Sequence, residues 1–171
     1  MKRFKIILLF DKIITLKYYY YKEDKMELKF ITSNDKEWQK AIEYIQNCPW
    51  KAGKSLASKM INNYFNDWQR VLIVLKDNNI IAFCTFTKED CIKDVNYRPF
   101  IGYIYVDEKY RGYRLSKKMI DKAIDYASSL GFTAVYIVSD HVNLYEKYGF
   151  KICDYKENRH GKIEKIYQKK I

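Results

Sequence analysis

Glycine, proline, cysteine and histidine are all scarce in this sequence. Its 171 residues include 6 Gly, 2 Pro, 4 Cys and 2 His. So little proline and glycine excludes collagen-like and Pro/Gly-rich disordered chains. The four cysteines form no C-x-x-C pair and only two histidines could join them, which argues against a zinc site, and we expect no metal. Scattered cysteines are typical of reduced thiols, so we predict a cytoplasmic protein.

Long apolar runs are also absent from the sequence. The apolar run at residues 6–10 is too short to span a bilayer, and Asp11 and Lys12 interrupt it. No small-residue cleavage site follows the basic start, which argues against a signal peptide. We therefore expect no membrane partner. Met26 opens an ordinary domain start, "MELKFITSNDKEW", and the hypothesis is that residues 1–25 are an extension ahead of the biological start.

The chain does contain a large apolar and aromatic fraction and an excess of positive charge. Hydrophobic residues make up 48% and aromatic residues 17%, enough for one domain with its own core. The net charge of +11 is compatible with binding to nucleic acid, to an anionic membrane or to an anionic ligand. No basic run of five residues and no nucleic-acid motif occurs, so we expect no nucleic-acid partner. A generally basic surface and a specific anionic partner both stay open.

Hydrophobic periodicity and turn residues predict a single α/β domain whose sheet has mixed strand direction. The predicted element order is β-α-α-β-β-β-α-β-α-β-β. Asn34 and Glu37 have the spacing of a capping box at the first helix. The predicted strands cover residues 27–32, 70–75, 80–87, 99–106, 132–138, 150–155 and 163–167, and the predicted helices cover residues 34–46, 54–65, 114–130 and 142–148.

The segment "YRGYRLSKKMI", residues 110–120, joins a predicted strand to a predicted helix. The first N–H groups of a helix have no partner inside it, and the helix dipole makes that end attractive to anions. Gly112 permits a sharp turn, and Arg111 and Arg114 add positive charge. The segment is therefore either a phosphate site or a basic, solvated helix start.

Two longer stretches of sequence favour the phosphate site over the solvated helix start. They are "IGYIYVDEKYRGYRLSKKMIDKAIDYASSLGF" and "AVYIVSDHVNLYEKYGF", which together cover residues 101–150. At this spacing the chain resembles the GNAT superfamily of acetyl-CoA-dependent N-acetyltransferases. The resemblance implies a mixed, splayed central sheet flanked by helices, acetyl-CoA as co-substrate, and one N-acetyltransferase domain over residues 26–171.

The resemblance also implies a set of cofactor-binding residues. The family pattern of the loop is Q/R-x-x-G-x-G/A; Arg111 matches it, while Arg114 and Ser116 replace the usual small residues. The backbone of the preceding strand would bind the pantetheine arm, with the Tyr105 side chain on the opposite face. The predicted cofactor-binding residues are Ile104, Tyr105, Val106, Arg111, Gly112, Tyr113, Arg114, Leu115, Ser116 and Lys117.

Two catalytic residues are predicted from the second stretch. Tyr145, in "NLYEKYGF", matches the tyrosine that the family uses as general acid for the CoA thiolate; the alternative is that it packs under the helix. His141 is a candidate base or substrate ligand, or else it orders the helix start, where Asp140 is the expected cap. No carboxylate on the strand at residues 99–106 supplies an evident general base.

The amine acceptor is not identified by the sequence. Trp38, Trp50, Phe65 and Trp68 are candidates for an aromatic wall, residues 48–60 for a lid, and Glu89, Asp90 and Asp94 for binding a cationic acceptor. The leading function is direct transfer of acetyl from acetyl-CoA to a primary amine. The alternatives are a non-catalytic acyl-CoA sensor on the same fold and a basic nucleic-acid-binding module. A homodimer is possible.

Overall fold

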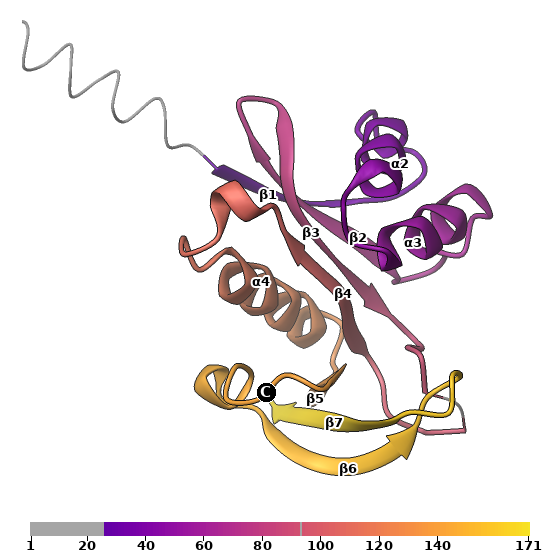
Figure 1. Cartoon of the computed structure of the whole chain (residues 1–171), viewed down its shortest axis with the longest axis vertical. Helices are drawn as coiled ribbons and strands as arrows, with labels where there is room; N and C mark the ends of the chain where they lie inside the picture. The colour runs from indigo at the N-terminus through magenta and orange to yellow at the C-terminus, as the bar shows by residue number, and fades with distance from the viewer. Residues whose placement is uncertain (1–25, 93) are drawn as a thin grey trace, which may run out of the picture.

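A computed structural model describes residues 26–92 and 94–171, so the predicted N-terminal extension lies outside the described residues. This part of the chain forms a seven-stranded sheet with the order β1-β2-β3-β4-β5-β7-β6. Figure 1 shows α2 and α3 on one face of the sheet and α4 on the other. The strands are β1 (Met26–Ile31), β2 (Arg70–Lys76), β3 (Asn79–Thr87), β4 (Phe100–Val106), β5 (Ala134–Ser139), β6 (Lys151–Glu157) and β7 (Ile163–Lys170), and the helices are α2 (Trp38–Asn47), α3 (Ala52–Ile61) and α4 (Leu115–Ser129).

Two hydrophobic cores lie on opposite faces of the sheet. Leu72 and Val74 of β2 belong to the core that includes the apolar stripe of α4, whereas Val71 and Ile73 belong to the core under α2 and α3. This alternation follows from the pleat, which points successive side chains to opposite faces. Because both faces are covered, β2 and β3 are buried along almost their whole length.

The sheet is splayed between β4 and β5. These parallel strands pair at one position only, Phe100 with Tyr136. Next to this point β4 carries a bulge, because Tyr103 and Ile104 stand opposite the single residue Cys84 of β3. Tyr103 has a φ of 48° at the bulge. The predicted fold class, a mixed and splayed central sheet flanked by helices, is confirmed.

The predicted helix at residues 142–148 is wrong. The chain there is irregular, and only a 3-10 turn, Glu146–Tyr148, forms within it. Asn143 has a φ of 59°, which interrupts a right-handed helix. Val142, at the start of the segment, is 69% exposed, so burial does not stabilise a first helical turn there. Asp140 is therefore not a helix cap; its carboxylate accepts a hydrogen bond from Lys162 Nζ at 2.7 Å.

The first helix also begins later than the capping-box spacing predicts. Helix α2 starts at Trp38, and its N-cap residue, Glu37, makes no side-chain capping bond. The Glu37 carboxylate instead accepts from Lys29 Nζ of β1 at 2.7 Å. Asp35 accepts from the Thr32 N–H at 2.9 Å and closes a turn ahead of the helix. Polar side chains here anchor the connection to the sheet, and these bonds take the place of a local cap.

Across residues 26–92 and 94–171, no helix has the length and hydropathy that a membrane crossing requires.

Candidate active site

A cavity of about 670 Å³ lies beside the splayed strands. Side chains of β4 and β5 line it together with the start of α3, the connection between β3 and β4, the segment after β5, and the turn between β6 and β7. The residues are Trp50, Lys51, Ala52, Ser55, Lys59, Asp90, Cys91, Ile101, Gly102, Tyr103, Ile104, Ile137, Val138, Ser139, Asp140, His141, Tyr145, Arg159, His160 and Glu164.

The loop before α4 has the backbone geometry of an anion site. Gly112 has a φ of 89°, and Arg114, the N-cap residue, has a φ of 57°. No side chain caps the helix. Within the described residues, the N–H groups from Gly112 to Lys117 have no hydrogen-bond acceptor. A cluster of unpartnered N–H donors at the positive end of a 15-residue helix fits a pyrophosphate group.

The side chains of this loop leave that end of the helix open. Arg114 and Tyr113 are exposed, and Arg114 makes no capping bond. Arg111 pairs with Glu108 at 3.1 Å, and Lys117 pairs with Asp121 at 2.6 Å. Arg114, which replaces a usual small residue of the family pattern, adopts the left-handed conformation that glycine usually supplies.

Other predicted cofactor residues contribute backbone groups. Leu115 is 2% exposed and belongs to the core under α4, so only its N–H is available to a ligand. Tyr105 faces the α2 and α3 side, where its ring stacks on Trp50 at 6.0 Å. Ile104 lines the cavity on the β4 strand. Beyond Phe100, β4 does not pair with β5, so the backbone of β4 is open there to an added strand.

Ser116 is held by a tyrosine from a distant segment. Its hydroxyl lies 3.1 Å from the hydroxyl of Tyr148, in the turn that follows Tyr145. This bond ties the start of α4 to the segment that carries the predicted acid. The two motifs on which the family resemblance rests are therefore in direct contact.

Tyr145 lines the cavity from the segment after β5 and is 5% exposed. Its ring packs against Phe150 and Tyr167, at centroid distances of 6.3 and 5.4 Å. Burial raises the pKa of its hydroxyl to about 12, and the nearby Ser139 hydroxyl partly opposes that rise. The phenol therefore keeps its proton at physiological pH, as a general acid must. The Tyr145 side chain packs against neighbouring rings and also lines the cavity. A packing role and the predicted role as general acid are therefore compatible.

His141 also lines the cavity, but from a more open position. Its side chain is 63% exposed, and its ring stacks on that of Tyr145 at 6.2 Å. The backbone carbonyl of His141 accepts from the Tyr167 hydroxyl at 2.7 Å, which fixes the chain at this point. Nδ1 lies 4.0 Å from the Asp140 carboxylate. The geometry suits a residue at the mouth of the cavity.

The four candidate aromatic residues of the acceptor wall separate in the structure. Only Trp50 lines the cavity, next to the start of α3. Trp38 and Phe65 are buried in the core under α2 and α3, and Trp68 packs against the core under α4. The predicted lid at residues 48–60 is largely helix α3, which lines the cavity with Ala52, Ser55 and Lys59.

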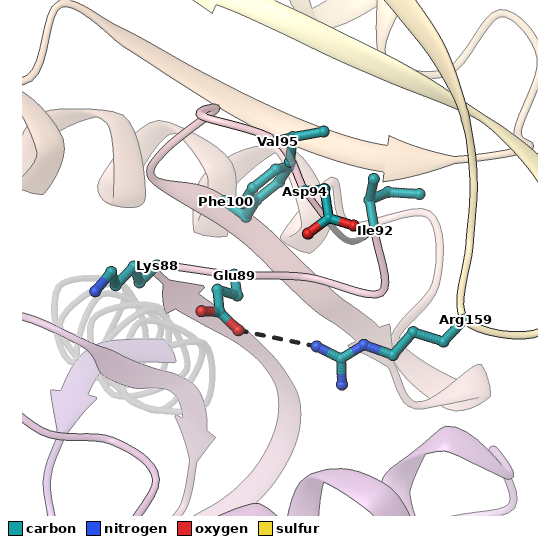
Figure 2. A pocket seen from close by; sticks show the side chains of 7 residues that line it. All are labelled: Lys88, Glu89, Ile92, Asp94, Val95, Phe100 and Arg159. Carbon is teal, nitrogen blue, oxygen red and sulfur yellow. Dashed lines mark ion pairs between the residues drawn. The ribbon is translucent and has the colours of Figure 1, made fainter.

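The three candidate carboxylates also separate. Asp90 lines the large cavity, whereas Glu89 and Asp94 line a smaller one of about 210 Å³ behind it. Figure 2 shows Glu89 directed at Arg159, with which it forms an ion pair of 3.8 Å. Arg159 comes from the β6–β7 turn and lines both cavities. Only Asp90 is thus placed to meet a ligand that shares a cavity with Tyr145.

Sequence reasoning missed several cavity residues. Ser55 and Tyr103 join α3 to β4 through a hydrogen bond of 3.2 Å between their hydroxyls. Lys59, one turn further along α3, lies over the Tyr103 ring at 5.3 Å. Arg159 donates its backbone N–H to the carbonyl of Cys91 at 3.0 Å, which docks the β6–β7 turn on the β3–β4 connection. No local sequence pattern marks these residues, because each belongs to a different element.

Comparisons with known proteins agree with this geometry. The model of the acetyltransferase (GNAT) family matches residues 34–150. N-alpha-acetyltransferase 30 of Saccharomyces cerevisiae is 30% identical over 97 residues, which are 51% of this chain and 55% of that protein. The chain therefore spans about half the length of this curated relative.

Solved structures share the fold at low sequence identity. A GNAT acetyltransferase from Elizabethkingia anophelis with acetyl-CoA bound is 16% identical, with a TM-score of 0.61 over 86% of this chain and 99% of that one. The NatC complex bound to Gag peptide and CoA is 15% identical, with a TM-score of 0.63 over 86% and 99%. Aminoglycoside 6'-acetyltransferase type Ii is 13% identical, with a TM-score of 0.64 over 84% and 96%. The family resemblance is confirmed: the chain belongs to the GNAT family of acetyl-CoA-dependent N-acetyltransferases.

Proposed function

We propose that the protein transfers the acetyl group of acetyl-CoA directly to a primary amine, with Tyr145 as the acid for the departing CoA thiolate. The observation that carries this proposal is the position of Tyr145, whose side chain faces the cavity beside the splayed edge of β4. The same cavity has room for an acceptor between β4 and α3. Membership in the family is the basis for the proposed reaction, and this arrangement supports the proposed residues.

Each part of the site has one task in the proposed reaction. The N–H groups at the start of α4 bind the pyrophosphate of acetyl-CoA, and the β4 backbone binds its pantetheine arm. Bound acetyl-CoA supplies the thioester carbonyl that a neutral amine attacks. As the carbon–sulfur bond breaks, the Tyr145 hydroxyl donates to the sulfur, and the proton released by the amine leaves to solvent or to a base. The Ser139 hydroxyl forms a hydrogen bond with the Tyr145 hydroxyl, and the Tyr167 ring packs against the Tyr145 ring.

Direct transfer is favoured over an acetyl-cysteine intermediate by the state of the cysteines. Cys84 is 0% exposed, and burial raises the pKa of its thiol. Cys91 lines the cavity, but burial raises the pKa of its thiol to about 12, with a further rise caused by the neighbouring Asp90 carboxylate. A nucleophilic cysteine needs a thiolate, and both of these residues stay protonated at neutral pH.

The test is an amine panel assayed by release of free thiol from acetyl-CoA, with mass spectrometry of the acceptor. Thiol release that depends on a primary amine and yields its N-acetyl product supports the proposal. If acetyl-CoA raises the melting temperature and no amine consumes it, the protein is the acyl-CoA sensor instead. If acetyl-CoA causes no thermal shift and the protein binds DNA or RNA in a salt-sensitive way, the nucleic-acid module replaces both. Sedimentation velocity tests whether the protein forms a homodimer.

A further inference from the structure

The Asp90 carboxylate occupies space that Gly102 leaves open because it has no side chain. Asp90 lies on the connection between β3 and β4, is partly buried, and lines the cavity that contains Tyr145. A Cβ atom on Gly102 of β4 would lie 2.5 Å from Asp90 Oδ2. Gly102 does not have a positive φ, so its conformation does not require glycine. The glycine is needed for room, because any side chain on β4 at this point would displace the carboxylate.

The Asp90 carboxylate is only partly compensated inside the protein, because burial raises its pKa more than Lys59 and Arg159 lower it. Oδ1 accepts a hydrogen bond from the Cys91 N–H at 2.6 Å. Within the described residues no lysine or arginine forms an ion pair with it. The hydroxyl of Thr85 is buried without a hydrogen-bond partner and lies 3.3 Å from the same Cβ position on Gly102. Burial also raises the pKa of the Asp90 carboxyl.

Partial burial of a carboxylate without an ion pair costs free energy, and a cationic ligand offsets that cost. An ammonium group supplies both the charge and the hydrogen-bond donors that the Asp90 carboxylate lacks. The Asp90 carboxylate also contributes to the raised pKa of Tyr145, so the two groups are within electrostatic range across the cavity. An amine held at Asp90 is therefore close to Tyr145. It binds as the ammonium and gives up one proton, to the Asp90 carboxylate or to solvent, before the neutral nitrogen attacks the thioester.

The other charges of the cavity limit which amines fit. Lys51, Lys59 and Arg159 line it together with Asp90. The remaining two acids on its wall, Asp140 and Glu164, are both engaged by Lys162, at 2.7 and 3.3 Å. One carboxylate is thus available for an ammonium group. A second ammonium on the same acceptor would meet three cations.

We propose that Asp90 binds the ammonium group of the acceptor, and that the surrounding cations restrict the acceptor to molecules with one ammonium next to a carbonyl or carboxylate. This inference rests on the proposed acetyl transfer and names the acceptor chemistry: an α-amino group, carried either by a free amino acid or by a peptide N-terminus. Polyamines and aminoglycosides are excluded as acceptors, although some proteins with this fold are named as aminoglycoside acetyltransferases.

The test uses three probes with the acetyl-CoA-saturated protein: a mixture of free amino acids, a randomised tripeptide mixture with free N-termini, and spermidine. We expect turnover with the amino acids or the tripeptides and not with spermidine. Asp90→Asn should raise the apparent KM roughly ten- to a hundredfold, the loss expected for one charged hydrogen bond, and leave acetyl-CoA affinity unchanged. Glu89→Gln, the control on the adjacent carboxylate, should change KM less than about twofold.

Two further variants keep the inference open to refutation. Gly102→Ala should reproduce the loss of Asp90→Asn, because it displaces the same carboxylate. Lys59→Met should raise spermidine turnover about tenfold, since it removes a cation from the cavity. Equal KM values for wild type and Asp90→Asn, or spermidine as the better substrate of the wild type, would overturn the inference.

The same probes separate failure of the inference from failure of the proposed function. They are also added to CoA-saturated protein in a thermal-shift assay. If no amine is acetylated but the α-amino probes raise the melting temperature of the wild type and not of Asp90→Asn, the proposed function fails and the Asp90 site stands. If the α-amino probes cause neither turnover nor a shift, the Asp90 site fails as well.

Discussion

The cofactor side and the acceptor side of this protein are built in different ways. The residues predicted to bind acetyl-CoA are 104–106 and 111–117, and the contribution proposed for them is mainly backbone N–H and C=O groups. The acceptor cavity takes side chains from several separate elements, including α3, the β3–β4 connection and the β6–β7 turn. A backbone site tolerates changes of side chain, whereas a side-chain site depends on each residue. The acceptor is therefore the part that can vary while the cofactor stays the same.

The largest expected effect is a loss of the chemical step without a loss of acetyl-CoA or acceptor binding. Tyr145→Phe should lower kcat by roughly 100- to 10,000-fold, because it removes the acid but keeps the packed ring. The acetyl-CoA dissociation constant should change less than about twofold, since the α4 backbone does not involve this hydroxyl. Steady-state thiol release and calorimetric titration measure the two quantities.

Tyr136→Phe is the matched control for that substitution. Tyr136 lies on β5, and its hydroxyl accepts a hydrogen bond from Gln168 at 2.9 Å outside the cavity. It should leave kcat nearly unchanged. A Tyr145→Phe enzyme with wild-type kcat would remove Tyr145 as the acid and leave the reaction without an assigned donor.

The second effect tests whether backbone conformation carries cofactor binding. Gly112 has a φ of 89° with open space around it, so Gly112→Ala introduces strain of about 1–2 kcal/mol and no clash. We expect acetyl-CoA affinity to fall by up to about tenfold. Gly131→Ala is the control, because Gly131 has a φ of 82° and equally open space at the other end of α4. Both variants should lose similar stability in urea, and only the first should lose affinity.

The third prediction tests whether the backbone or the side chain of Arg114 is used in cofactor binding. Arg114→Gly relieves a left-handed conformation that costs an arginine about 1–2 kcal/mol, against roughly 0.5–1 kcal/mol for the added freedom of glycine. The net result should be a gain in stability of about 0.5–1 kcal/mol, read from chemical denaturation. Acetyl-CoA affinity should change less than about threefold. A large loss of affinity would show that the Arg114 side chain, rather than the backbone, holds the phosphate.

The smallest effect concerns pH. The raised pKa of Tyr145, about 12, means that the phenol stays protonated as pH rises through 10. A tyrosine with an ordinary pKa of about 10 would be half ionised there, and kcat would fall about twofold. We expect kcat to hold its plateau up to pH 10, measured with saturating acceptor and brief assays. A decline centred near pH 10 would mean that the cavity is more hydrated than its burial indicates.

Much of the fold follows from local sequence patterns. The strands β2 and β3 appear as apolar, β-branched runs around a polar turn, and α4 appears as an apolar stripe closed by Gly131. The helix predicted at residues 142–148 does not form because Asn143 has a φ of 59° and Val142 beside it is exposed. The start of α2 was mispredicted because Lys29, from β1, binds the glutamate expected to cap it. Local rules fail where a partner from elsewhere in the chain intervenes.

The sequence by itself determined the family, the strand–loop–helix that suits pyrophosphate, and the tyrosine of the second motif, because these features are contiguous and their spacing is fixed by the chain. Only the tertiary structure decided which of three acids in one connection faces the cavity, and which of four aromatic residues lines it. Those choices depend on the bulge in β4, on the space at Gly102, and on the docking of the β6–β7 turn. Each is a contact between elements distant in sequence, and no local period or spacing records it.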